Sequence, residues 1–304
     1  MEILLLQHKN KLKEKITSIV LCAGEGARAK NIAENIPKPL IKVKSLKNQS
    51  ILSLIISNLM NLKLDPIVVV TGHLGEQITD FVNSPQIKNQ YDEESILIHS
   101  SGVRYKLGPL YSFLSITTNN QIFKDDKIFM VFPGDTVFDY KLLREILDLL
   151  LENYSQVIHK SIIFYRKIRT DILKKKLEKY YPNYEKSISY LKIEEKNSKT
   201  IVKEIFQEKL SSISNEEVIN QIIPIFIFSS EYVKIIKDLT STVRFRYIRE
   251  VVNLMIIKKK RFFALSVSPE YNFYDIDTYL DLKILNEKKK VDNSSSDYLR
   301  KLVS

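Results

Sequence analysis

A loop near the start of the chain combines two glycines with two basic side chains in a spacing that suits phosphate binding. Residues 21–28 read Leu-Cys-Ala-Gly-Glu-Gly-Ala-Arg, and Lys38 stands between two prolines ten residues after Arg28. Because glycine carries no side chain, the backbone N–H groups of such a loop can approach phosphate oxygens closely. Arg28 offers a planar fork of donors, and Lys38 offers a point charge for a second phosphate. A surface ion pair is the competing explanation for Arg28, and the nearby Lys38 favours the phosphate site.

The loop differs from two familiar phosphate-binding motifs. It lacks the Gly-Lys-Ser/Thr ending of a Walker loop, and no third glycine follows Gly26 at the spacing of a dinucleotide fingerprint. The sequence also has no Gly-x-Ser-x-Gly motif, and its four histidines lack the spacing of metal ligands. These observations exclude several common enzyme classes and leave phosphate chemistry without a protein nucleophile.

A carboxylate follows the apolar run at residues 128–132, in the sequence Pro133-Gly134-Asp135. If this run is a parallel strand, Asp135 lies at its carboxyl end, where open α/β sheets bind their ligands. Magnesium prefers one or two carboxylates, completed by phosphate oxygens and water. Asp135 is therefore a candidate Mg²⁺ ligand.

Two further segments could serve a ligand or simply begin a helix. Asp275 and Asp277 precede the last predicted helix, where aspartate is a favoured N-cap residue. Gly108 stands before Pro109, and its missing side chain would let a flat base approach the backbone. Proline is also common at an ordinary helix start, so both interpretations of each segment stay open at this point.

The elements that must position these residues follow from hydrophobic periodicity. Short apolar runs predict strands at 16–22, 66–71, 95–99, 127–132, 222–228 and 262–267, and a hairpin at 189–195 and 200–207. Helical spacing predicts helices at 50–62, 140–152, 230–239, 244–257 and 278–287. Strands that alternate with helices indicate an α/β fold with a Rossmann-like, mostly parallel mixed sheet, helices on both faces and an antiparallel hairpin in the second half.

Glycine is scarce, since the 304 residues contain only seven, and all of them lie at or before position 134. A scarce glycine is expected where a side chain cannot fit or where the backbone touches a ligand. The close-fitting loops are therefore predicted in the first half. Basic residues concentrate in the second half instead: 16 of the 47 Lys and Arg lie in residues 1–140, which leaves 31 for the rest of the chain. This excess suits an anionic partner, although solvated helix faces or helix ends are the stronger explanation.

The glycine loop with Arg28, the Pro37–Leu40 motif and the later Val-Val-Val-Thr-Gly-His run at 68–73 together resemble the N-terminal signature of the sugar-1-phosphate nucleotidyltransferase family. This superfamily includes cytidylyltransferases of phosphorylated alcohols. The resemblance is densest over residues 16–140. It implies transfer of an NMP group from an NTP to a sugar-1-phosphate or a phosphorylated alcohol, with release of pyrophosphate and with Mg²⁺ as cofactor.

The resemblance also implies roles for single residues. Arg28 and Lys38 are the expected catalytic cations, with Arg28 on the β- and γ-phosphates and Lys38 near the α-phosphate. Asp135 and Asp277 are the expected metal ligands, with Asp275 in reserve. The nucleotide is expected on Ala23, Gly24, Glu25, Gly26 and Gly108, with Tyr105 and Ser112 as weaker base-site candidates, and the acceptor phosphate is expected on Lys209.

This interpretation predicts a nucleotide-binding half at 1–140, an acceptor-binding half at 141–290 and a C-terminal tail at 291–304. Three alternatives remain: a molybdopterin-type nucleotidylyltransferase, a catalytically silent regulatory module on the same fold, and a nucleic-acid binder, which no recognisable module supports. The single cysteine, Cys22, and the absence of a long apolar run predict a cytoplasmic protein without a membrane span. The apolar stretch at residues 3–6 is too short for a signal peptide.

Overall fold

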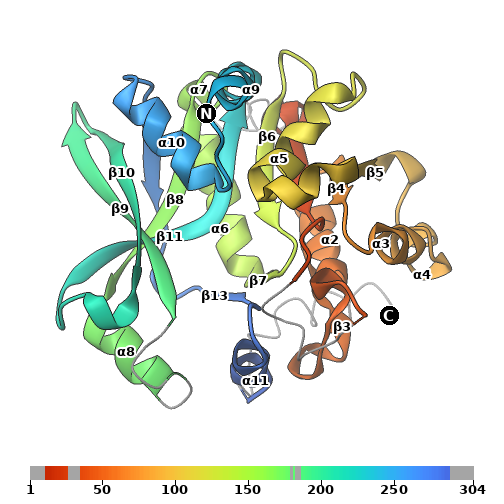
Figure 1. Cartoon of the computed structure of the whole chain (residues 1–304), viewed down its shortest axis with the longest axis horizontal. Helices are drawn as coiled ribbons and strands as arrows, with labels where there is room; N and C mark the ends of the chain where they lie inside the picture. The colour runs from red at the N-terminus through yellow and green to blue at the C-terminus, as the bar shows by residue number, and fades with distance from the viewer. Residues whose placement is uncertain (1–10, 27–34, 179–180, 182–185, 288–304) are drawn as a thin grey trace.

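The computed structural model describes residues 11–26, 35–178, 181 and 186–287 (Figure 1). Arg28, the N-terminal stretch 3–6 and the expected tail 291–304 lie outside the described residues. A nine-stranded mixed sheet forms the centre of the molecule, in the order β5-β4-β1-β6-β11-β8-β12-β10-β9. Its strands are β1 (Ile16–Leu21), β4 (Ile67–Thr71), β5 (Ile96–Ser100), β6 (Ile128–Pro133), β8 (Ser161–Arg169), β9 (Ser187–Lys196), β10 (Lys199–Lys209), β11 (Val218–Ser229) and β12 (Phe262–Ser266).

The sheet has two differently built parts. Strands β5, β4, β1 and β6 are mutually parallel, so their carboxyl ends lie at one edge. Strand β11 runs antiparallel to β6 and β8, and β9 and β10 form a long antiparallel hairpin. Figure 1 shows this hairpin at one end of the sheet and β5 at the other. Two small sheets accompany the large one: β2 (Lys42–Val43) with β3 (Gln49–Ser50), and β7 (Thr136–Phe138) with β13 (Phe273–Asp275).

Helices cover both faces of the sheet. They are α2 (Ile51–Asn61), α3 (Gly75–Val82), α4 (Pro85–Lys88), α5 (Pro109–Leu114), α6 (Tyr140–Glu152), α7 (Tyr154–Val157), α8 (Thr170–Glu178), α9 (Ser230–Thr242), α10 (Ile248–Ile257) and α11 (Tyr279–Glu287). Short 3₁₀ turns include η2 (Lys38–Leu40), η3 (Lys44–Leu46) and η5 (Gly102–Leu107). No helix among the described residues is long and apolar enough to cross a membrane.

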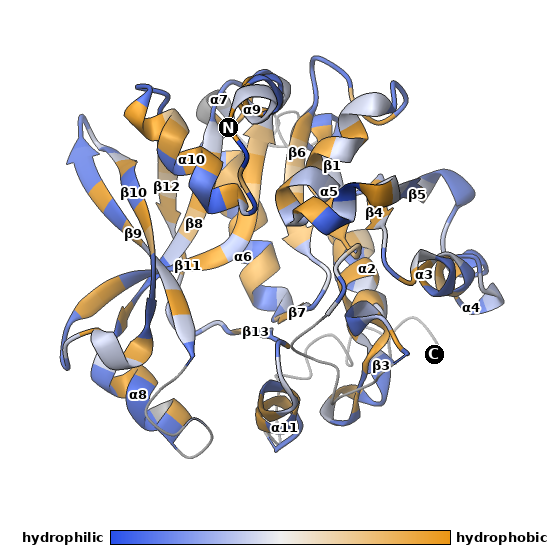
Figure 2. Cartoon of the chain, viewed as in Figure 1, coloured by the Kyte–Doolittle hydropathy of each residue, from blue (hydrophilic) through white to orange (hydrophobic). Residues whose placement is uncertain are grey.

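Alternation along the strands divides the interior into two cores. In β6, Ile128, Met130 and Phe132 pack on one face, with α2 and α6, whereas Phe129 and Val131 pack on the other, with α5, α9 and α10. Because side chains of a strand point alternately to opposite faces, a strand covered on both sides must be apolar throughout. Figure 2 shows this as continuous hydrophobic colour along the central strands and mixed colour on the outer helices.

The expected α/β fold with a mixed sheet and a second-half hairpin is confirmed. The main difference lies between 158 and 180, where β8 and α8 were not predicted. No glycine or proline bounds β8 in the sequence, so its apolar run lacked the turn signals that mark the strands of the first half. The helix expected at 244–257 begins at Ile248, after a turn capped by the Glu250 carboxylate, which accepts from the backbone N–H of Tyr247 at 3.0 Å.

Candidate active site

Three loops meet at the carboxyl edge of the parallel strands. The N–H of Cys22 donates to Val70 O at 2.9 Å, and the N–H of His73 donates to Ala23 O at 3.1 Å. The N–H of Gly134 donates to Leu21 O at 3.0 Å. These bonds fix the start of the glycine loop between the loops that follow β4 and β6.

Close backbone approach explains two of the scarce glycines. A Cβ on Gly72 would lie 2.8 Å from the Ala23 Cβ, and one on Gly134 would lie 2.6 Å from Leu21 O. Gly24 differs, because a Cβ there would have no atom within 4 Å. No contact within the described chain therefore requires glycine at position 24, and the residue is exposed.

The glycine loop also reaches Lys38. Gly26 has a φ of +60°, and a Cβ there would lie 3.2 Å from Lys38 Cγ. Ala23 is buried, at 1% exposed, whereas Gly24 and Glu25 are exposed. Lys38 begins the turn η2, and its carbonyl accepts from the N–H of Ile41 at 3.0 Å.

The pairing of β7 with β13 brings together carboxylates that are far apart in the sequence. The strands are antiparallel, with Thr136 opposite Asp275, so the residue before β7 lies beside the residues after β13. The N–H of Ile276 donates to Asp135 O at 3.0 Å and closes this junction. Asp135 and Asp277 therefore face one another across the end of a two-stranded ribbon.

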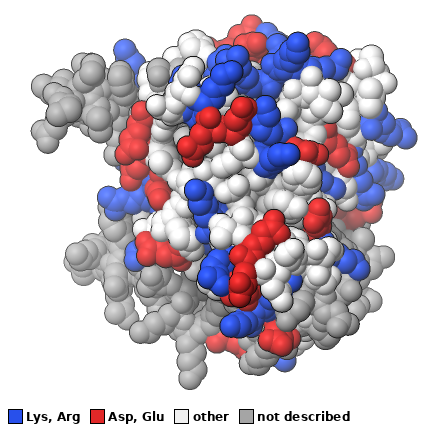
Figure 3. All heavy atoms as spheres, turned by 90° about the vertical axis from the view of Figure 1, so that its left-hand side faces the viewer, with Lys and Arg blue, Asp and Glu red and all other residues white. Residues whose placement is uncertain are grey.

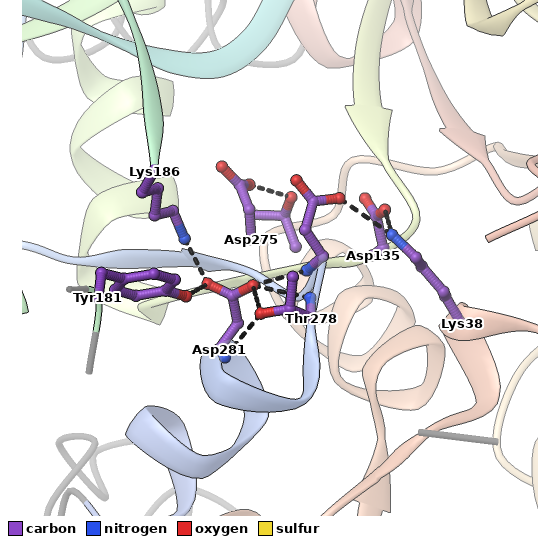
Figure 4. A network of polar contacts seen from close by, with 9 residues as sticks. Lys38, Asp135, Tyr181, Lys186, Asp275, Thr278 and Asp281 are labelled. Atoms are coloured by element: carbon purple, nitrogen blue, oxygen red, sulfur yellow. Dashed lines mark hydrogen bonds and ion pairs between the residues drawn. The ribbon is translucent and has the colours of Figure 1, made fainter. Parts of the chain in front are cut away.

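Lys38 contacts both of these carboxylates, and Figure 4 shows its ammonium group beside Asp135. Its Nζ is 3.2 Å from Asp135 Oδ2 and 3.0 Å from Asp277 Oδ1, and its side chain is only 11% exposed. Burial acts to lower the pKa of Lys38, but the two carboxylates outweigh it, so the pKa is raised. Lys38 is thus a firmly protonated cation at the centre of the three-residue group.

Burial raises the pKa of Asp135, with Asp277 adding to the effect and Lys38 opposing it. Two carboxylates held close together repel each other, and this repulsion favours any cation that can lie between them. Asp277 and Asp135 are both about one-third exposed, so the group remains open to a ligand.

The donor set fits magnesium. Within the described residues no group of three or more His, Cys, Asp or Glu side chains is arranged to hold a metal ion. Two carboxylates are the protein ligands expected of Mg²⁺ that is completed by phosphate oxygens and water. Asp135 and Asp277 would therefore hold the ion, and Lys38 would then be free to turn toward a phosphate.

Asp275, the reserve candidate, has a different partner. Its Oδ1 accepts from the Thr136 hydroxyl at 2.6 Å. Burial raises the pKa of Asp275 to about 6, although Lys186 and the Thr136 hydrogen bond oppose the shift. Because Lys38 contacts Asp277 rather than Asp275, we favour Asp277 as the second metal ligand.

A residue that sequence reasoning missed holds the Asp277 turn in place. Asp281, which is 5% exposed, accepts from the N–H of Asp277 at 3.1 Å and from the N–H of Thr278 at 2.8 Å. Its other oxygen accepts from the Tyr181 hydroxyl and from Lys186 Nζ. Burial alone would raise the pKa of Asp281, but these donors lower it. Figure 4 shows Asp281 between Thr278 on one side and Tyr181 and Lys186 on the other.

A pocket of about 710 Å³ adjoins this centre. Pro133 and Asp277 line it on the side of the carboxylates, and residues of β8, β9, β10, β11 and α10 line the opposite wall. Among its lining residues are three cations: Arg166, Lys186 and Arg249.

Lys209, the expected acceptor ligand, is exposed at the end of β10 and is not among the residues that line this pocket. Lys186, which precedes β9, does line it, and its carbonyl accepts from the N–H of Leu210, so the two lysines belong to neighbouring strand ends. The motif indicated the lysine at the end of β10, because a sequence motif does not reveal which residue of a neighbouring strand lines the pocket. The role of Lys209 stays a prediction.

Gly108 owes its missing side chain to a contact within the protein. Its φ is +118°, and a Cβ there would lie 2.6 Å from Arg246 O. Tyr105 lies near the glycine loop, because its Cβ is 2.9 Å from the position of a Cβ on Gly72. Ser112 is 3% exposed, inside α5. These placements leave the base-site assignment a prediction.

Comparison with known proteins identifies the first half of the chain. Residues 18–163 match the model of the family described as the MobA-like NTP transferase domain. Over these residues the chain is similar to an NTP transferase domain. The domain contains Lys38, Asp135 and the described glycines, whereas Asp277, Asp281 and Lys186 lie in the sequence beyond it.

Two curated relatives match part of the chain. A UTP–glucose-1-phosphate uridylyltransferase from Synechocystis sp. is 27% identical over 128 residues, which are 41% of this chain and 32% of the relative. The bifunctional protein GlmU from Methanococcus maripaludis is 33% identical over 132 residues, which are 43% of this chain and 27% of the relative. The chain therefore spans a third or less of the length of these curated relatives.

Solved structures match over nearly the whole chain, beyond the NTP transferase domain. A UTP-bound UGPase from Acinetobacter baumannii has a TM-score of 0.65 at 11% identity, covering 94% of this chain and 98% of that one. The inositol-1-phosphate CTP transferase from T. maritima has a TM-score of 0.58 at 14% identity, covering 90% and 96%. At these identities the likeness shows that the fold is shared, including its second half.

Proposed function

We propose that this protein is a nucleotidyltransferase that joins the NMP group of an NTP to a phosphorylated small molecule, a sugar-1-phosphate or a phosphorylated alcohol, and releases pyrophosphate. The observation that carries this proposal is the position of Lys38. It lies between two carboxylates at the carboxyl edge of the parallel strands, against the glycine loop and next to a large pocket.

The reaction needs few protein groups. An oxygen of the acceptor phosphate attacks the α-phosphorus of the NTP, a new P–O bond forms, and the bond to the pyrophosphate oxygen breaks. A phosphate monoester has a second pKa near 6, so it is already a dianion at neutral pH and requires no general base. The barrier comes instead from bringing two anions together in line.

The residues of the centre supply that neutralisation. Lys38, firmly protonated, places its charge on the phosphates, and the exposed backbone of Gly24 and Glu25 offers N–H donors to the triphosphate. A magnesium ion on Asp135 and Asp277 would add a second positive charge at the phosphates. Arg28 is proposed as a further cation on the leaving pyrophosphate, from its position in the sequence.

The pocket on the far side of Asp277 is proposed as the acceptor site. Its volume lies within the range of small-molecule sites, and Lys186 brings a cation to the same end as Asp277. By their names, one curated relative acts on glucose-1-phosphate and one structural neighbour on inositol-1-phosphate, which supports this class of acceptor. Cys22 is buried and single, and we place the reaction in a reducing compartment, the cytoplasm.

A pyrophosphate-release assay tests the proposal. Each of the four NTPs is combined with Mg²⁺ and a panel of sugar-1-phosphates and alcohol phosphates. We expect pyrophosphate to appear only when both an NTP and an acceptor are present, and to disappear when EDTA is added. If no pair releases pyrophosphate while the NTP still binds in a titration, the chain is a silent binding module instead.

A further inference from the structure

A second buried cation in the pocket, Arg166, forms no hydrogen bond or ion pair with a carboxylate of the described residues. Arg166 lies in β8, is 5% exposed and lines the pocket. Its Nε donates to Gln221 Oε1 at 2.9 Å, and its Nη1 donates to Tyr271 O at 2.5 Å. The guanidinium also lies over the Phe273 ring, 5.1 Å from its centre. All of these partners are neutral.

The remaining nitrogen, Nη2, has no partner within the described part of the chain. Ser161 Oγ is the one side-chain polar atom there that is both sealed from solvent and without a hydrogen bond. Nη2 is therefore not sealed in the core, and the opening on which Arg166 borders is the pocket. The fork thus presents a free edge to whatever the pocket binds.

A buried guanidinium that is not in contact with a carboxylate is costly to the folded protein. Burial lowers the pKa of Arg166, and Tyr274 and the Asp139 carboxylate oppose the shift only in part, yet arginine stays protonated at neutral pH, so its charge cannot be discarded. The fixed geometry of Nε and Nη1 also means that the fork is already oriented, and a ligand would lose little entropy by ordering it. An anionic group that fits against Nη2 would gain a charge-assisted hydrogen bond in a poorly hydrated place.

The other two cations that line the pocket are less buried than Arg166 or are paired with a carboxylate. Lys186 is neutralised by Asp281, at 2.5 Å. Arg249 lies over the Tyr247 ring, 4.2 Å from its centre, and is half-buried at the pocket wall. No ion pair of Arg166 or Arg249 occurs among the residues in the structure's described ranges. The wall that carries them is otherwise largely apolar, with Leu173, Leu177, Ile188, Ile205, Ile222, Phe226 and Ile248.

Arg166 also lies away from the carboxylate that would hold the metal. Its ring partner, Phe273, is four residues before Asp277, with the extended strand β13 between them. Four extended residues span up to about 13 Å. The contacts of Arg166 are at the start of β13 and Asp277 is beyond its end, so we expect the guanidinium to face a different part of a bound acceptor from the phosphate at the Asp277 end.

We propose that the acceptor carries a second anionic group, a carboxylate or a further phosphate, and that Arg166 binds it at the floor of the pocket. This inference rests on the proposed function and narrows its acceptor to a phosphomonoester with two separated anionic ends and a compact body between them. A neutral hexose phosphate or a cationic alcohol phosphate would leave Nη2 of Arg166 without an anionic partner.

Matched acceptors that differ in one carboxylate test this assignment. Glucuronic acid 1-phosphate is compared with glucose 1-phosphate, and 3-phosphoglycerate with glycerol 3-phosphate, each with the NTP that supports the fastest release of pyrophosphate. We expect kcat/KM of the wild-type protein to be at least about tenfold higher for the carboxylate member of one pair, and Arg166→Gln to bring the ratio close to one. Arg169→Gln is the matched control, because Arg169 lies in the same strand, half-exposed and paired with Asp171 at 3.0 Å, and should keep the ratio.

Other results would overturn the inference. Equal kcat/KM within both pairs, or a ratio that Arg166→Gln leaves unchanged, would mean that Arg166 binds the common phosphate or only supports the fold. If Arg166→Gln does not fold, Arg166→Lys provides the comparison, since it keeps the charge but loses the fork, and we expect it to reduce the ratio at least about threefold.

Calorimetric titration separates this inference from the proposed function. If the wild-type protein releases no pyrophosphate with any pair, the function fails, and binding of the four acceptors then decides the role of Arg166. Tighter binding of the carboxylate member, lost in Arg166→Gln, supports the anion site by itself. Equal binding, or none, overturns it.

Discussion

Two buried cations of this protein, Lys38 and Arg166, stand in different electrostatic surroundings. Lys38 lies between Asp135 and Asp277, and its charge is balanced within the folded chain. Arg166 has an amide, a carbonyl and an aromatic ring for partners. Two carboxylates already contact Lys38, so a ligand must displace at least one of them to reach the ammonium group. Arg166 contacts no carboxylate, so an anionic ligand can bind it without displacing a protein group. The comparison shows that one crevice can hold a cation whose charge is balanced by the protein and another that hydrogen-bonds only neutral groups. The first suits catalysis and the second suits recognition of an anionic ligand.

The surface of the protein shows no comparable difference in charge between regions. Figure 3 shows Lys and Arg interspersed with Asp and Glu on the face that carries the β9–β10 hairpin, rather than a field of one sign. A groove on the hairpin side is lined by Lys196, Lys203 and Arg261 together with Glu194, which pairs with Lys203 at 2.9 Å. The charge arrangement that matters for binding is therefore the one inside the crevice.

Removing the balanced cation should have the largest effect. We expect Lys38→Ala to lower turnover at least about a hundredfold, because it deletes a preorganised charge at the phosphates and leaves two carboxylates facing each other. Asp135→Asn should have an effect of the same order. Pyrophosphate release by the purified variants measures both. Lys42→Ala, at an exposed position four residues on, is the control, and wild-type turnover in Lys38→Ala would remove this residue from the mechanism.

The second-largest effect is expected at Asp281, which connects the Asp277 turn to Lys186 of the pocket. Asp281→Asn should lower turnover about tenfold through a misplaced Asp277, and should destabilise the fold by about 2–4 kcal/mol, because a buried carboxylate with several donors is lost. Since the pKa of Asp281 is lowered in the folded state, its stabilisation is present above pH 4 and disappears as the pH falls below that value. Thermal melts from pH 3 to 8 should show this loss.

Asp238→Asn, at an exposed position on α9, provides the control for Asp281→Asn. An Asp281→Asn variant with a lower melting temperature but unchanged kcat would show that Asp281 stabilises the turn without positioning Asp277.

A smaller effect of opposite sign is expected at Asp275. Its pKa is raised to about 6, so its charged form is unfavourable in the folded state, and stability is lost as the pH rises through 6. Asp275→Asn keeps the acceptor for Thr136 and should stabilise the fold by about 2 kcal/mol at pH 7, with no gain near pH 4. Turnover should fall less than tenfold, whereas Asp277→Asn should lose about a hundredfold. A reversed order would make Asp275 the metal ligand.

The smallest effect distinguishes ligand contact from packing in the glycine loop. Gly24→Ala should leave the melting temperature within about 1 °C, because the added Cβ meets no atom within 4 Å, while the KM for the NTP rises about threefold to tenfold. Gly134→Ala is the contrasting variant, since its Cβ would lie 2.6 Å from Leu21 O, and it should lose stability. An unchanged KM in Gly24→Ala would show that the phosphates bind elsewhere.

The first half of the molecule could be predicted well from the sequence, and the second half less well. Glycines and prolines mark the ends of β1, β4 and β6, so the strands and the loops beyond them were visible. Lys38 and Asp135 could be identified because each stands beside such a marker. Lys186, Asp281 and Arg166 stand in segments without glycine, where no local signal distinguishes a pocket residue from a surface one.

The sequence by itself determined the parallel α/β half, because apolar runs of strand length must be buried and scarce glycines must fall where backbones touch. Only the tertiary structure decided that Asp277 meets Asp135 and that Arg166 faces a pocket. Those contacts depend on the pairing of β7 with β13 and of β8 with β11, between residues 49 to 139 positions apart in the chain. Hydrophobic patterning fixes which side of a strand is buried but not which distant strand lies next to it.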